Sequence, residues 1–170
     1  MTLIVCGLAE VPALIASRAP SHLVTLLDAA SMIETPDSFT ADRHLRISVN
    51  DIAEPMEGLI LPSEDIVRRL LEFGRGWDAS APMIVHCWAG ISRSSASAFV
   101  LACDRNPHAN ELAIAMGMRQ AAKHAYPNRR IVAIADDMLG RRGRMVDAVE
   151  AMGDYEYSGV GAPFELAATY

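Results

Sequence analysis

The first half of the chain contains short apolar runs that are separated by polar or turn-forming residues. Each run is too short for a helix, which favours buried strands. In one of them, Leu45, Ile47 and Val49 alternate with polar neighbours, which is typical of a half-buried strand. The predicted strands cover residues 3–8, 22–28, 44–51 and 82–87.

Helical patterns lie between these strands and fill the second half of the chain. Ser63, followed by two acidic residues, is a favourable start for a helix, and Gly74 is a plausible end. The predicted helices cover residues 10–18, 63–74, 92–103, 110–124, 129–139 and 141–152. Strands that alternate with helices, followed by helices alone, predict an α/β fold. We expect a central, mostly parallel, twisted sheet of about four to five strands flanked by helices, with a helical C-terminal half.

The composition fits one globular domain. The chain has 170 residues, 51% of them hydrophobic, and its charges are interspersed. No apolar run reaches the roughly 18 residues of a membrane span, and Glu10 interrupts the apolar N-terminus, which does not resemble a secretory signal. Three widely spaced cysteines, Cys6, Cys87 and Cys103, form no metal-ligand pair. We therefore expect a reducing, cytoplasmic setting, no metal site and no membrane partner.

The net charge of −6 is unevenly distributed along the chain. Residues 104–144 carry eight Lys or Arg against four Asp or Glu. This excess is too weak for a duplex-binding protein, which argues against nucleic acid as a partner. The basic segment fits either an anionic ligand or a solvated helical face. Fourteen arginines against one lysine are typical of GC-rich, bacterial genomes.

The stretch HCWAGISRS, from His86 to Ser94, places Cys87 between a buried strand and a helix. A helix start leaves backbone N–H groups unpaired and carries a partial positive charge, so a loop that curls over it suits a tetrahedral anion. Gly90 permits the backbone angles that such a curl needs. The same field favours a thiolate, and the thiolate is the nucleophilic form of cysteine. This pattern predicts Cys87 as a nucleophile.

Three neighbours complete the chemistry of this stretch. The planar guanidinium of Arg93 can bind two phosphate oxygens at once. Ser94 can donate a hydrogen bond to the sulfur and make it a better leaving group, and His86 can orient the loop through its ring nitrogens. Phosphoryl transfer mostly needs positioning and charge neutralisation, which this loop supplies. The alternative is a buried, inert cysteine beside an unrelated arginine.

HCWAGISRS resembles the signature loop of the cysteine-dependent protein tyrosine phosphatases, H-C-x-x-G-x-x-R-[ST], and is most similar to the dual-specificity group. The resemblance implies a phosphotyrosine protein phosphatase-like fold, a phosphocysteine intermediate at Cys87, and no metal or cofactor. It implies one phosphatase domain over residues 1–152, followed by a C-terminal tail over 153–170 that we expect to be loosely held. Phosphate binding would fall to Arg93 and to the backbone of Trp88, Ala89, Gly90, Ile91 and Ser92.

The family also needs a carboxylic acid that protonates the leaving group. In the family this acid is an aspartate about thirty residues before the cysteine. Asp51 ends a predicted strand 36 residues before Cys87, and its local VND resembles the strand end of dual-specificity members. Glu54 and Glu57 lie on the same loop and are rivals. Asp51 can also be only a turn residue that terminates the strand.

A second stretch, YPNRRIVAI, resembles the P-N-x-x-F segment of the family, whose asparagine helps hold the active-site loops. Asn128 would be that residue, although a helix cap is an equally good interpretation. Ile131 replaces the usual aromatic residue. Ile134 stands where a water-placing glutamine is common, which implies that hydrolysis relies on Asp51 alone.

Two further side chains have open interpretations. Trp88 can touch substrate from the rim of the loop or pack on the core. Cys6 can form a protective disulfide with Cys87 or serve as a core residue.

Together these features predict a phosphatase that acts on a phosphorylated protein or a small phosphate monoester. Phosphotyrosine is the expected substrate, with phosphoserine and phosphothreonine left open. Phosphoinositides are less favoured because the loop lacks extra lysines. Two rivals are a phosphate-binding module without turnover, and a sulfur-transfer or arsenate-reducing enzyme that uses a similar anion loop.

Overall fold

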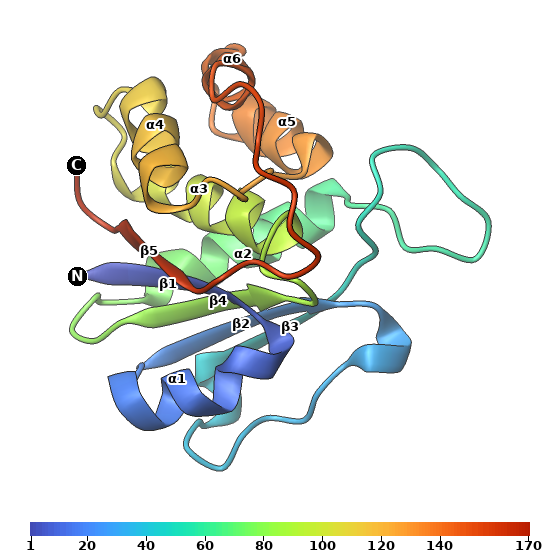
Figure 1. Cartoon of the computed structure of the whole chain (residues 1–170), viewed down its shortest axis with the longest axis vertical. Helices are drawn as coiled ribbons and strands as arrows, with labels where there is room; N and C mark the ends of the chain where they lie inside the picture. Colours follow the sequence, from blue (N-terminus) through green and yellow to red (C-terminus); the bar gives the residue numbers. More distant parts are fainter.

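A five-stranded sheet organises the computed structural model, which describes residues 1–170 (Figure 1). The strand order is β3-β2-β4-β1-β5, and the first four strands in this order are parallel. The predicted α/β class, with a mostly parallel central sheet, is confirmed. The strands are β1 (Thr2–Gly7), β2 (His22–Leu27), β3 (His44–Ser48), β4 (Met83–Cys87) and β5 (Phe164–Ala167).

The end of the chain is not loosely held, so that prediction was wrong. β5 pairs antiparallel with β1 at the edge of the sheet, with Phe164 opposite Val5 and Leu166 opposite Leu3. Phe164 and Leu166 are buried, while the residues that alternate with them are exposed. A four-residue strand of this kind takes its stability from pairing and burial rather than from its own sequence, and this explains why it was missed.

The helices form two unequal layers around the sheet. Figure 1 shows α1 alone on one face and α2 to α6 gathered on the other, with α3 close to the sheet. All six predicted helices form, although the fourth ends at Ala121 and the sixth starts only at Arg144. None of them has the length and apolar character needed to cross a membrane. Their bounds are α1 (Val11–Arg18), α2 (Glu64–Gly76), α3 (Arg93–Arg105), α4 (Glu111–Ala121), α5 (Arg129–Met138) and α6 (Arg144–Glu150).

Each face of the sheet has its own hydrophobic core. The larger core lies under α2 to α6, and a smaller one, which includes Cys6 and Val11, lies under α1. The helix α3 is buried from Arg93 to Cys103, which fixes its N-terminus firmly against the sheet. Arg93, the first residue of α3, is therefore held in a fixed position next to the end of β4.

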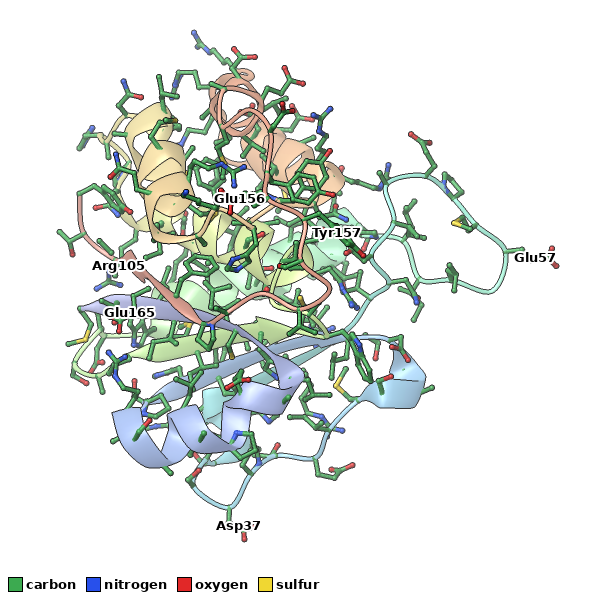
Figure 2. The ribbon with its side chains drawn as sticks, in the orientation of Figure 1. Asp37, Glu57, Arg105, Glu156, Tyr157 and Glu165 are labelled. Atoms are coloured by element: carbon green, nitrogen blue, oxygen red, sulfur yellow. The ribbon has the colours of Figure 1, made fainter.

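The parallel strands all end at one edge of the sheet, where ligands commonly bind in α/β proteins. β4 ends there at Cys87, and β3 ends at Ser48, three residues before Asp51. The loop that connects β3 to α2 projects from this edge, with Glu57 at its far end (Figure 2). The topology therefore brings Cys87 and Asp51 to the same edge.

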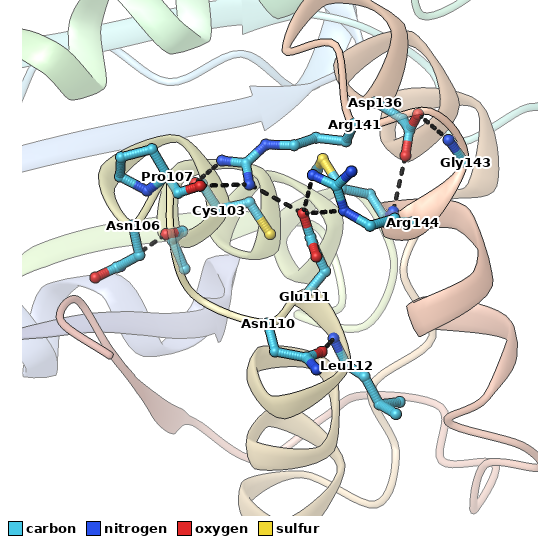
Figure 3. Close-up of polar contacts among 12 residues, drawn as sticks. Cys103, Asn106, Pro107, Asn110, Glu111, Leu112, Asp136, Arg141, Gly143 and Arg144 are labelled. Atoms are coloured by element: carbon cyan, nitrogen blue, oxygen red, sulfur yellow. Dashed lines mark hydrogen bonds and ion pairs between the residues drawn. The ribbon is translucent and has the colours of Figure 1, made fainter.

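Away from this edge, a buried ion-pair network joins α3, α4 and α6 (Figure 3). Arg141 donates to the Glu111 carboxylate at 2.9 Å and to the carbonyl of Cys103 at 2.6 Å. Arg144 donates to the same carboxylate at 3.1 Å. Because Cys103 lies in the last turn of α3, its carbonyl has no partner within the helix, and Arg141 supplies one.

We expect Glu111→Ala to destabilise the protein by about 3–5 kcal/mol, because it leaves the buried Arg141 charge unpaired. The exposed Glu34, which pairs with Arg46, offers a control whose replacement by alanine should cost less than about 1 kcal/mol. Urea unfolding monitored by circular dichroism measures both. Equal losses of unfolding free energy in the two variants would contradict the assignment of Glu111 to a buried, stabilising ion pair.

The same pair makes stability depend on pH. Burial alone would raise the pKa of the Glu111 carboxyl, but hydrogen bonds from its backbone surroundings, Arg144 and Arg141 outweigh burial and lower the pKa. A depressed pKa stabilises the fold above the ordinary value of about 4.3, and this contribution disappears as the pH falls through the folded value. The stability difference between wild type and Glu111→Ala should therefore shrink in acid.

Candidate active site

Cys87 lies at the end of β4, next to the N-terminus of α3. Its side chain is buried, and its Sγ is 3.1 Å from the Oγ of Ser94 in the first turn of α3. Burial, the largest cause, raises the pKa of the Cys6 and Cys103 thiols to about 12. All three cysteines are free, and Cys6 lies in the smaller core on the opposite face of the sheet from Cys87. This placement does not favour a Cys6–Cys87 disulfide.

The carbonyl groups of the cysteine loop, residues 88–92, point outward and bind to surrounding segments of the chain. Four of these carbonyls accept hydrogen bonds from backbone N–H groups of other segments. The bonds run from Leu8 N to Trp88 O (3.1 Å), from Gly161 N to Ala89 O (2.8 Å), from Tyr126 N to Ile91 O (3.0 Å) and from Asn128 N to Ser92 O (3.2 Å).

The N–H groups of the loop consequently point the other way. In a trans peptide, the C=O and the following N–H lie on opposite sides, and the chain has no cis peptide. None of the N–H groups of residues 88–93 donates a hydrogen bond within the chain. Gly90 and Arg93 are buried, and buried N–H groups are rarely left unpaired in proteins. A ring of free donors at a helix start is a site for an anion.

Gly90 allows the loop to curl. Its φ is +73°, a backbone conformation that side chains disfavour. A Cβ at this position would lie 2.6 Å from the carbonyl carbon of Cys6 and from the N of Gly7. The loop is therefore packed directly against the end of β1, and only glycine fits there.

Arg93, the first residue of α3, has a guanidinium that is only partly satisfied by hydrogen bonds. The side chain is buried, and Nη1 donates to the Val49 carbonyl at 2.8 Å, which anchors it beyond the end of β3. Its Nε is buried without any partner. An unsatisfied buried N–H costs free energy, so this donor is a second indication of an anionic ligand.

Asp51 is the one candidate acid that contacts the cysteine loop. Its Oδ1 accepts hydrogen bonds from the Oγ of Ser92 at 2.7 Å and from the Nδ2 of Asn128 at 2.9 Å. Glu54 is exposed and makes no hydrogen bond, and Glu57 lies at the far end of the projecting loop (Figure 2). The structure therefore brings Asp51, and not Glu57, to the site.

Asn128 has both of the contacts considered for it. Its Oδ1 caps α5 by accepting from the N–H of Ile131 at 3.1 Å. Its Nδ2 donates to Asp51 and to the carbonyl of Ile52 at 3.3 Å. One side chain thus ties the start of α5 to the loop that carries Asp51.

Trp88 is 57% exposed, so it lies on the rim of the site rather than in the core.

His86 belongs to a buried chain of hydrogen bonds that sequence analysis missed. Its Nε2 is 2.7 Å from the Oγ1 of Thr25, which is 2.8 Å from Nε2 of His44, and His44 Nδ1 is 3.0 Å from the Oγ1 of Thr35. Burial is the main cause that lowers the pKa of both histidines to about 4, so both are neutral near pH 7. His86 Nδ1 then donates to the Cys87 carbonyl at 3.4 Å. The one sequence signal for this chain of hydrogen bonds was Thr25, a single threonine in the apolar strand at residues 22–28.

Cavity size alone does not locate this site. A cavity of about 570 Å³ lies between α4 and α6 and includes no residue of the cysteine loop. The candidate site is instead defined by the free backbone donors of residues 88–93 and by Arg93.

No family profile matches the chain, and no curated protein matches its sequence. Among solved structures, the chain resembles DUSP15 with a TM-score of 0.62 at 15% identity, covering 88% of this chain and 89% of that one. It also resembles PTPMT1 in complex with PI(5)P, with a TM-score of 0.58 at 14% identity, covering 82% and 91%. Both are cysteine-based phosphatases. The chain therefore has the fold of these phosphatases, as the resemblance implied.

Proposed function

We propose that this protein is a phosphatase that hydrolyses phosphate monoesters, phosphotyrosine foremost, through a phosphocysteine intermediate on Cys87. One observation carries the proposal: the N–H groups of residues 88–93, which directly follow Cys87 at the end of β4, and the buried Nε of Arg93 have no hydrogen-bond partner within the protein. Donors fixed in advance around a developing negative charge are the main source of catalysis in phosphoryl transfer.

In the first step, the Cys87 thiolate attacks phosphorus in line with the leaving oxygen. The S–P bond forms as the P–O bond to the leaving group breaks. Asp51 gives its proton to the departing oxygen, while Arg93 and the loop amides neutralise the phosphate oxygens. Ser92 and Asn128 donate to Oδ1 and hold the Asp51 carboxyl group in position for this transfer.

In the second step, water attacks the phosphocysteine. The Asp51 carboxylate takes a proton from that water, the P–S bond breaks, and inorganic phosphate leaves. Ser94 donates its hydroxyl proton toward the departing sulfur across 3.1 Å, which stabilises the thiolate as a leaving group. A thiolate nucleophile needs a reducing setting such as the cytoplasm, where we propose that the protein acts.

The substrate class follows from the rim of the site. Trp88, the first residue of the loop, is exposed, and Arg93 is the one basic residue between positions 86 and 94. PTPMT1 was crystallised with a phosphoinositide. A polyphosphorylated headgroup favours several cations around the loop, whereas an aromatic rim favours a monoester carried by an aromatic or apolar group. We therefore propose phosphotyrosine, on a protein or as a small molecule, over phosphoinositides.

Rapid-mixing assays with p-nitrophenyl phosphate test the proposed function. We expect a burst of p-nitrophenol that approaches one equivalent per protein where dephosphorylation limits the rate, and a phosphoenzyme that can be trapped at acid pH and mapped to Cys87. A phosphate-binding module would bind phosphate and release no product. A sulfur-transfer or arsenate-reducing enzyme would use the same cysteine without forming a phosphoenzyme.

A further inference from the structure

The C-terminal segment supplies one of the four outer supports of the cysteine loop. In Figure 1 it runs down from α6 past the start of α3 and then turns into β5. Along the way, the N–H of Gly161 donates to the carbonyl of Ala89 at 2.8 Å. The other three supports come from the end of β1 and from the connection between α4 and α5.

This segment is fixed on both sides of Gly161. Before it, the Tyr155 ring stacks on Tyr126 with ring centroids 4.4 Å apart, and the N–H of Glu156 donates to the Lys123 carbonyl at 2.9 Å. After it, β5 pairs with β1. We call residues 155–163 the C-terminal strap, because both of its ends are attached to the body of the protein.

Gly161 lies where a side chain does not fit. A Cβ there would lie 2.5 Å from Nε2 of His124 and 3.3 Å from the carbonyl oxygen of Gly90. The His124 ring is itself held edge-on against Phe164 of β5, with centroids 5.7 Å apart. The close approach of Gly161 to the cysteine loop therefore depends on the absence of a side chain.

We propose that Gly161, held in place by the C-terminal strap, is a positioning residue for the anion loop. The Ala89 carbonyl and the Gly90 N–H belong to one trans peptide, so the bond from Gly161 turns the Gly90 N–H toward the anion. The catalytic consequence rests on the proposed function, but the effect on anion binding does not.

The matched pair Gly161→Ala and Gly159→Ala tests this role. Gly159 lies two residues away, a Cβ there would meet nothing within 4 Å, and we assign it no role. Phosphate binding is measured as protection of Cys87 from iodoacetate, which requires no turnover. We expect Gly161→Ala to weaken protection by about tenfold, less than the loss seen when an oxyanion donor is removed outright. Gly159→Ala should match the wild type.

A second pair separates positioning from folding. In the His124→Ala background the ring is absent, so Gly161→Ala should regain most of the phosphate affinity, whereas Gly161→Pro, which has no N–H, should not. Thermal unfolding checks that each variant is folded. Equal phosphate affinity in the alanine and proline variants would overturn the proposal.

The two proposals fail in different ways. Loss of phosphate protection in Gly161→Ala, in a protein without phosphatase turnover, would support the strap and reject the proposed function. If the wild type turns over substrate and Gly161→Ala keeps the same phosphate affinity and rate, the proposed function is supported and the role of Gly161 is rejected.

Discussion

Replacing Cys87 by serine is expected to lower the turnover of p-nitrophenyl phosphate by at least about 10⁴-fold, because a serine hydroxyl is a weak nucleophile without an adjacent base. The variant should keep its phosphate affinity, since the loop amides and Arg93 are untouched. Steady-state kinetics and isothermal titration with phosphate measure the two effects separately.

The other two cysteines provide the controls for this substitution. Cys6 and Cys103 are fully buried in the two cores, and neither contacts the cysteine loop through a side-chain hydrogen bond. Cys6→Ala and Cys103→Ala should retain turnover as long as they fold. Substantial turnover in Cys87→Ser would mean that the protein does not work through a phosphocysteine.

Replacing Asp51 by asparagine is expected to slow catalysis by an amount that depends on the leaving group. An alkyl or tyrosyl oxygen needs a proton as it departs, so phosphotyrosine should lose about 10²–10⁴-fold in kcat. Nitrophenolate leaves without help, so p-nitrophenyl phosphate should lose much less. Asparagine retains the oxygen that accepts from Ser92 and Asn128, so the loop should keep its conformation.

Glu54→Gln and Glu57→Gln are the matched controls, because both carboxylates lie on the same loop without hydrogen bonds to the site. Neither variant should show a loss that depends on the leaving group. If Glu54→Gln shows that dependence and Asp51→Asn does not, the general acid is Glu54.

The parts of the site that sequence analysis could predict are local in the chain. The strand that ends at Cys87, the turn at Gly90 and the helix that starts at Arg93 follow one another directly in the chain, so spacing alone orders them. Ser63 similarly begins α2 through a cap within its own first turn. Helix caps and anion sites at helix starts depend on residues that are close together in the chain, so the sequence alone predicts them.

The missed parts depend on contacts between distant segments. Thr25 meets His86 because β2 lies beside β4, a register that no local pattern defines. β5 is stabilised by its pairing with the edge strand β1. Because β5 anchors the C-terminal strap, Gly161 lies within hydrogen-bond distance of Ala89. Sheet order and long-range pairing had to be known first, which is why the tail was mistaken for a loose end.

The central claim is that Cys87 is a reactive nucleophile because it lies next to an anion-binding site formed by the free loop amides and Arg93. Iodoacetate labelling at neutral pH, followed by peptide mass spectrometry, tests it most directly, with the buried Cys6 and Cys103 as internal controls whose raised pKa keeps them unreactive. We expect rapid carboxymethylation of Cys87 alone, slowed by inorganic phosphate in proportion to its occupancy. Slow labelling of Cys87 that is indifferent to phosphate would contradict the account.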